Sequence, residues 1–95
     1  MEKWTQSEAI AFECAREVIT HLRAILTGQI AEETSKDCPD AERVAALHAE
    51  RSQLFRERAG LRVKDQVTVA RVRAEYGARV RSLRSERAEH YAVAK

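Results

Sequence analysis

Three histidines and two cysteines are the residues best suited to metal or nucleophilic chemistry, but their spacing favours neither. His21, His48 and His90 lie far apart, and none has another His or Cys three or four residues away. Metal ligands on a helix need that spacing in order to share one face. We therefore expect surface or boundary histidines and predict no metal and no cofactor.

Acid–base and thiol chemistry are also disfavoured. Carboxylates occur in pairs at Glu13/Glu17 and Glu32/Glu33. On an exposed helix face such pairs stay solvated, which is a poor setting for a general acid or base. Cys14 is expected to act as a small apolar residue and Cys38 as a helix cap, since no histidine lies near Cys38 to activate it. With no phosphate-binding glycine loop in addition, the sequence predicts no catalytic residues and no enzyme.

Charge is distributed unevenly along the chain. Residues 1–37 carry a net charge of −3, residues 38–60 are neutral, and residues 61–95 carry +5, within an overall charge of +2. On a helical wheel, Arg73, Arg81 and Arg84 fall on one flank of a C-terminal helix with Gly77 between them. The opposite flank is acidic, with Glu75, Glu86 and Glu89. The C-terminal helix is thus predicted to have a basic edge and an acidic edge.

The basic edge has three interpretations. Arginines at Arg73, Arg81 and Arg84 can bind phosphate or carboxylate in bidentate fashion, and Gly77 would let a backbone approach closely. The partner would then be an acidic protein or, less favoured, nucleic acid, because there is no helix-turn-helix or zinc-finger pattern and no aromatic interleaving for base stacking. The third interpretation is a solvated helix face without a partner.

Trp4 and Gly28 are two further residues whose types predict a packing contact. Trp4 precedes a helix start and is expected to fold over the end of the helices, with a binding anchor as the alternative. Gly28 lies inside a helical stretch, where it costs up to about 1 kcal/mol relative to Ala. We expect close packing there against a second helix, near Leu47 and His48.

Helical periodicity dominates the chain. Thr5-Gln6-Ser7-Glu8 forms a capping box, which predicts a helix over residues 6–35, with an apolar stripe at Phe12, Ala15, Ile19, Leu22, Leu26 and Ile30. A turn at 36–38 precedes a helix over 39–60 that begins at Pro39. Its stripe is Val44, Leu47, Leu54 and Leu61, interrupted by Arg51 and Arg58, whose stems are expected to pack while their guanidinium groups reach an edge.

The C-terminal third is predicted to form a separate or kinked helix. Gly60 and the β-branched residues after it predict a break or kink over 60–65, with Asp65 able to cap the next helix. That helix should span 66–87, with a stripe at Val69, Val72, Tyr76, Val80 and Leu83, and residues 88–95 are expected to fray. The predicted fold is all-α: one domain over 1–95, as a three-helix bundle or a long helical hairpin with a kinked third helix.

Size and composition predict self-association. The 95 residues include 16 Ala but only 18 Ile, Leu or Val, so the core should be thin and a second copy would cover apolar surface. No run of 18 apolar residues occurs, and the N-terminal stretch carries acids where a signal peptide has bases. We therefore expect no membrane partner and a cytoplasmic location.

The segment WTQSEAIAFECARE, residues 4–17, resembles small helical proteins encoded on bacterial plasmids and other mobile elements. The resemblance names no characterised family and transfers no residue roles, but it implies an accessory, inhibitor or antitoxin-like role. Together with the charge pattern, it favours a non-enzymatic adaptor or inhibitor that binds another protein through helix surfaces. The alternative is a nucleic-acid-binding accessory protein that uses the basic edge.

Overall fold

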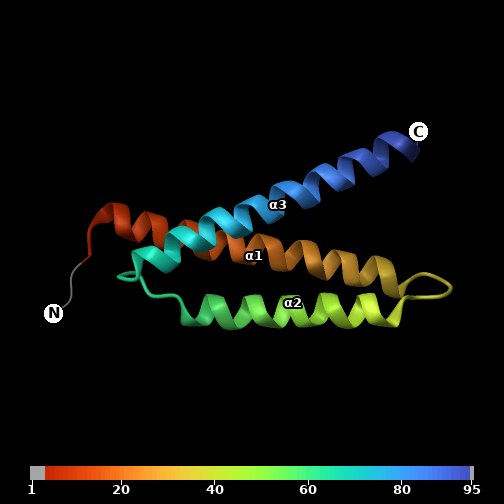
Figure 1. The fold of residues 1–95 in the computed structure, drawn as a ribbon, viewed down its shortest axis with the longest axis horizontal. Coiled ribbons are helices and arrows are strands. Elements are labelled where there is room, and N and C mark those ends of the chain that lie inside the picture. Colours follow the sequence, from red (N-terminus) through yellow and green to blue (C-terminus); the bar gives the residue numbers. More distant parts are fainter. Residues whose placement is uncertain (1–3, 95) are drawn as a thin grey trace.

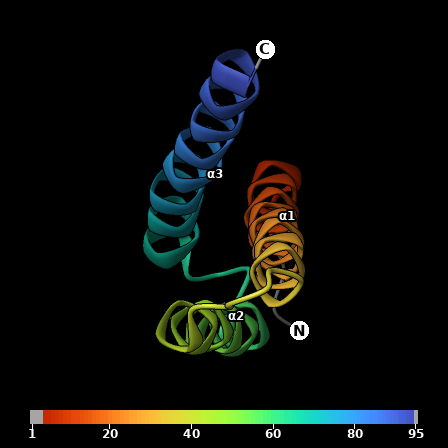
Figure 2. The ribbon, with the colours of Figure 1, turned by 90° about the vertical axis from the view of Figure 1, so that its right-hand side faces the viewer.

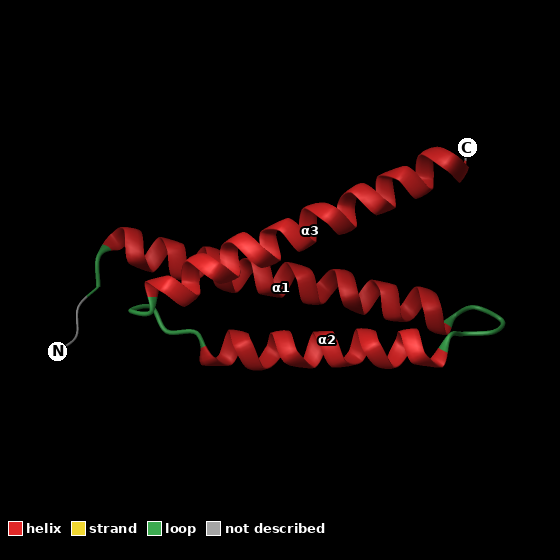
Figure 3. Ribbon diagram, in the orientation of Figure 1, coloured by secondary structure: helices red, strands yellow, loops and turns green. Residues whose placement is uncertain are grey.

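The structure is a computed structural model that describes residues 4–94 of the chain, with side chains described through Ala88. It contains three helices, α1 (Gln6–Thr34), α2 (Ala41–Gly60) and α3 (Gln66–Ala94), and no strand among these residues. The helices pack as an elongated three-helix bundle measuring 56 × 27 × 15 Å (Figures 1 and 3). The all-α prediction is therefore confirmed.

Helix α1 packs against both of the other helices. Helices α2 and α3 each approach α1 closely, whereas their backbones do not approach each other within the same range. Figure 1 shows α1 and α2 running side by side as a hairpin, while α3 crosses α1 and diverges from α2 toward its C-terminal end. In the end-on view of Figure 2 the three helices are not arranged as parallel rods. The space between α2 and α3 therefore widens along the bundle.

The core consists of the apolar stripes expected from the periodicity. Ala15, Ile19, Leu22, Leu26 and Ile30 of α1 are buried, as are Leu47 and Leu54 of α2, Leu61 after it, and Val69, Val72, Val80 and Leu83 of α3. Phe12 and Tyr76 are half-buried and pack against this cluster. Burial of a large aliphatic side chain contributes about 1.5–3 kcal/mol, so these three stripes supply the main stabilising term.

Helix starts follow from carboxylate and hydroxyl caps. Thr5 accepts from the amide of Glu8 at 3.1 Å while its own amide donates to Glu8 Oε1 at 2.7 Å, which confirms the capping box. At α2 the cap is Asp40, which accepts from the amides of Glu42 and Arg43. The predicted start at Pro39 and the predicted cap at Cys38 are wrong. A carboxylate that accepts two amides is a stronger cap than a thiol, so the helix begins after Asp40.

The second connection is a short loop between Gly60 and Gln66, so α2 and α3 are separate helices. Asp65 caps α3 as expected, accepting from the amide of Thr68 at 3.1 Å and from its hydroxyl at 2.7 Å. Helix α3 continues to Ala94, beyond the expected end near Arg87. Its backbone hydrogen bonds thus extend about 11 residues past Leu83, the last buried residue among those with described side chains.

Gly28 does not pack against α2. It is exposed, and a β-carbon built there would meet no atom within 4 Å. The neighbouring Thr27 accepts a hydrogen bond from Arg51 Nη1 at 3.1 Å. Residues 27 and 28 therefore lie near the predicted height along α2, one helical turn from Leu47 and His48. The face was wrong, since Gly28 lies on the side of α1 that points away from both neighbouring helices.

Candidate functional site

A groove between α1 and α3 brings together part of the predicted basic edge. Gly77, Val80, Arg81 and Arg84 of α3 line it from one side, and Cys14, Glu17, Val18 and His21 of α1 from the other. Its volume is about 360 Å³ and it is open to solvent. We call these eight residues the basic groove.

The guanidinium groups of the basic groove are not neutralised within the described part of the chain. Arg84 Nη2 donates to His21 Nε2 at 3.0 Å, which gives it a hydrogen bond but no countercharge. Arg81 is exposed and makes no ion pair or hydrogen bond with any described residue. Glu17, on the α1 side, is the one carboxylate lining the groove and pairs with neither arginine. The groove thus presents two available cations beside one acid.

The groove has an apolar and sterically open floor. Val80 is buried and Val18 half-buried. At Gly77 an added β-carbon would come within 3.5 Å of Arg81 Nη1, an ordinary contact with the end of a flexible side chain. Internal packing therefore does not require glycine at this position. The guanidinium group of Arg81 lies beside the position that a side chain would take.

Two predicted site residues lie elsewhere. Arg73 is exposed, makes no ion pair with the described residues and does not line the groove, because it lies two helical turns before Arg81. Trp4 is 52% exposed and precedes the cap of α1, also outside the groove. Four groove residues were not anticipated: Cys14, Glu17, Val18 and His21 of α1. None of the four was expected at a binding site, because the basic edge was drawn on the C-terminal helix alone.

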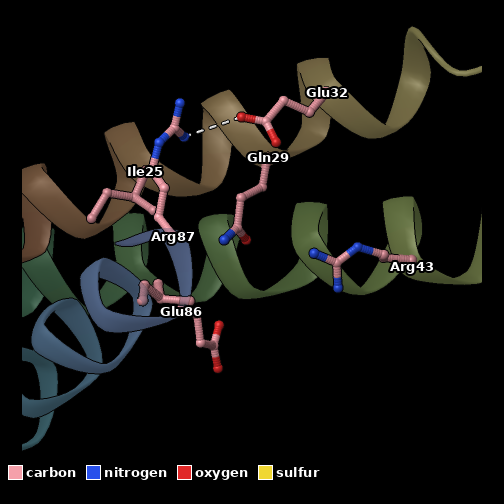
Figure 4. Close-up of a pocket in the computed structure, with 7 residues that line it drawn as sticks. Ile25, Gln29, Glu32, Arg43, Glu86 and Arg87 are labelled. Atoms are coloured by element: carbon pink, nitrogen blue, oxygen red, sulfur yellow. Dashed lines mark hydrogen bonds and ion pairs between the residues drawn. The ribbon is translucent and has the colours of Figure 1, made fainter. Parts of the chain in front are cut away.

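A second open site lies where α3 diverges from the hairpin. Ile25, Gln29 and Glu32 of α1, Arg43 of α2, and Leu83, Glu86 and Arg87 of α3 line a space of about 350 Å³, which we call the wedge. In Figure 4, Glu32 and Arg87 face each other across the two helices, joined at 3.1 Å, and Glu86 points away from them. No sequence pattern predicted this site, because it depends on the angle between α3 and α1.

Long polar side chains bridge α2 and α3 in the part of α3 that precedes the wedge. Arg79 forms two contacts of 3.2 Å with the carboxylate of Glu50. The Tyr76 hydroxyl donates to Glu57, which also lies 3.7 Å from Arg71. Burial, followed by the hydrogen bond to Glu57, raises the pKa of Tyr76 to about 12. These arginines are held by carboxylates, which distinguishes them from Arg81.

Arg51 and Arg58, which interrupt the apolar stripe of α2, differ in how fully their guanidinium groups are hydrogen-bonded. Arg51 is half-buried, and its guanidinium reaches Thr27 and His48 at the edge of the hairpin, as the stem-packing interpretation predicted. Arg58 is also half-buried, but its Nε is enclosed without a hydrogen-bond partner among the described residues. An enclosed, unpaired donor is costly, so Arg58 contributes less to the hairpin than its burial suggests.

No family model matches the chain, and neither the curated proteins nor the solved structures contain a significant match to it. Within the described residues, no helix is both long and apolar enough to cross a bilayer. The same residues hold no group of three or more side chains placed to bind a metal ion.

Proposed function

We propose that the chain is a non-enzymatic binding module that takes an acidic segment of a partner protein into the basic groove. The observation that supports this proposal is the pair Arg81 and Arg84, which flank an apolar floor without a neutralising carboxylate. Elsewhere on α3, Arg71 and Arg79 are held in ion pairs. An adaptor or inhibitor would use such a surface to recognise carboxylates on a partner helix.

The surroundings of the groove favour a protein over nucleic acid. Residues 1–37 carry a net charge of −3, and Glu17 lies in the groove wall, so an extended polyanion would meet repulsion beside the two arginines. The groove also has no aromatic side chain on which a base could stack. A compact acidic helix can contact Arg81 and Arg84 through two carboxylates while its apolar side covers Val18 and Val80.

The test uses fluorescence anisotropy with two labelled probes at physiological salt. One is a helical peptide with glutamates and leucines alternating at spacings of three and four; the other is a 20-base-pair DNA duplex. The wild-type chain is expected to bind the peptide more tightly than the duplex. Replacing Arg81 and Arg84 by Gln should weaken peptide binding at least tenfold, whereas Glu17→Lys should strengthen it.

The matched control is Arg56→Gln, which removes an exposed arginine from α2, outside the groove. This variant should bind the peptide like the wild type. The double Gln variant should retain its stability within about 0.5 kcal/mol, because both side chains are exposed. Sub-micromolar, sequence-dependent binding of the duplex would overturn the proposal in favour of nucleic acid. Equal peptide binding by all variants would show that the arginines are only solvated.

A further inference from the structure

The chain exposes more surface than a compact protein of its mass. Its accessible surface is 6837 Å², whereas about 5,500 Å² is expected for a folded monomer of 10.8 kDa. The excess of about 1,300 Å² is larger than the roughly 800 Å² that each partner buries in a standard protein–protein interface. The radius of gyration, 16.1 Å, likewise exceeds the value of about 12 Å expected for this length.

The wedge is one of the hollows on this surface, with a volume of about 350 Å³. Ile25 is half-buried at its floor beside Leu83, which is 6% exposed. Helix α3 overhangs this site, since it continues to Ala94 while residues 84–88 are all exposed. A helix entering the wedge would therefore contact both the apolar floor and the exposed side chains of α3.

The charges lining the wedge are balanced. It contains two acids, Glu32 and Glu86, and two bases, Arg43 and Arg87. Glu86 makes no ion pair or hydrogen bond with the described residues, and Arg43 has a 52% exposed side chain that reaches Glu33 at 3.4 Å. Glu32 and Arg87 already pair with each other at 3.1 Å, so Glu86 is the acid of the wedge that lacks a partner among the described residues. After a twofold rotation, Glu86 of one copy can face the exposed Arg43 of the other, and the reverse. A strongly acidic or strongly basic partner would lack this reciprocal match.

We propose that a second copy of this chain docks in the wedge, so that the protein forms a symmetric dimer through the opening between α3 and the α1–α2 hairpin. Glu86 of one copy then lies beside Arg43 of the other, and the exposed edge of Ile25 is covered. The basic groove shares no lining residue with the wedge, so this inference does not depend on the proposed function.

Sedimentation equilibrium between 1 and 100 µM tests the dimer. The wild type should dimerise in this range. Glu86→Lys, which places like charges together, should raise the dissociation constant at least tenfold, and Glu86→Gln should have a smaller effect in the same direction. Glu17→Lys makes the same charge change in the basic groove and should leave the dissociation constant unchanged.

Methyl NMR locates the interface. On dilution through the same range, the methyl resonances of Ile25 should shift, whereas those of Ile10, which is 56% exposed and outside the wedge, should not. A wild type that is folded and monomeric at 100 µM would overturn the proposal. So would a dimer that Glu86→Lys leaves intact or whose dissociation does not move Ile25. Failure of the acidic peptide to bind the basic groove would leave these results unaffected.

Discussion

Gly28 occupies an exposed position inside α1 where a side chain has open space. Since no atom lies within 4 Å of an added β-carbon, Gly28→Ala should increase the free energy of unfolding by about 0.5–1 kcal/mol through helix propensity alone. Urea unfolding followed by circular dichroism measures this. A loss of stability would show that something packs over this face in solution.

Glu33 is the buried charge of the bundle, 5% exposed at the C-terminal end of α1. It accepts from the amide of Asp40 and from Lys36 Nζ, both at 3.0 Å, and lies 3.4 Å from Arg43. The hydrogen bond from the Asp40 amide, followed by that from Lys36, lowers the pKa of Glu33 below its ordinary value. The side chain thereby ties the end of α1 to the start of α2.

Because folding lowers the pKa of Glu33, the ionised carboxylate stabilises the folded chain, and this stabilisation depends on pH. The stabilisation is fully present above the unfolded-state pKa and is lost as pH falls through the lower folded-state pKa. Glu33→Gln should therefore be less stable than the wild type at pH 7, and its urea midpoint should change less between pH 7 and pH 3. Glu42→Gln, at the same end of the bundle, controls for the lost charge. Parallel pH profiles for the wild type and Glu33→Gln would contradict this role.

At the scale of the elements, α1 is the helix on which both others depend. Leu22 and Leu26 are fully buried in its middle. Replacing either by Ala should reduce the free energy of unfolding by about 2–5 kcal/mol, because the cavity would lie at the junction of the three helices. A loss below about 0.5 kcal/mol in chemical denaturation would mean that this face of α1 is not in the core.

The helices and their buried faces could be predicted because periodicity and capping are local properties. The stripes from Ala15 to Ile30 and from Val69 to Leu83 needed only the helical repeat. The start of α2 was placed at Pro39 because proline suits the first turn of a helix, whereas the structure has Asp40 as the cap. The end of α3 was placed too early, since it has no sequence signal such as a glycine or proline.

The candidate sites were less predictable because they depend on angles between helices. Arg81, Arg84 and Gly77 were found from the wheel of one helix, which is a local argument. Glu17 and His21, on the opposite wall of the groove, lie more than 50 residues earlier, and only the crossing of α1 and α3 brings the two walls together. The wedge requires α3 to diverge from α2, which no local pattern specifies.

At the scale of the whole molecule, the divergence of α3 makes the chain extended. Small-angle X-ray scattering of the dilute monomer should therefore give a radius of gyration near 16 Å. Packing of α3 along α2 would give a smaller radius of gyration. The smaller value would show that α3 lies against α2 in solution and that the wedge is closed.

The backbone of α1 lies close to both other helices, whereas α2 and α3 contact each other through long side chains. The order of the helices along the chain therefore affects how the bundle forms during synthesis. Residues 1–60 contain the whole α1–α2 hairpin, so it can form while α3 is still emerging from the ribosome. Helix α3 then docks on a surface that already exists. Arg81 and Arg84 meet Glu17 and His21 only in this last event, so a nascent chain that stalls before residue 81 has a hairpin but no basic groove.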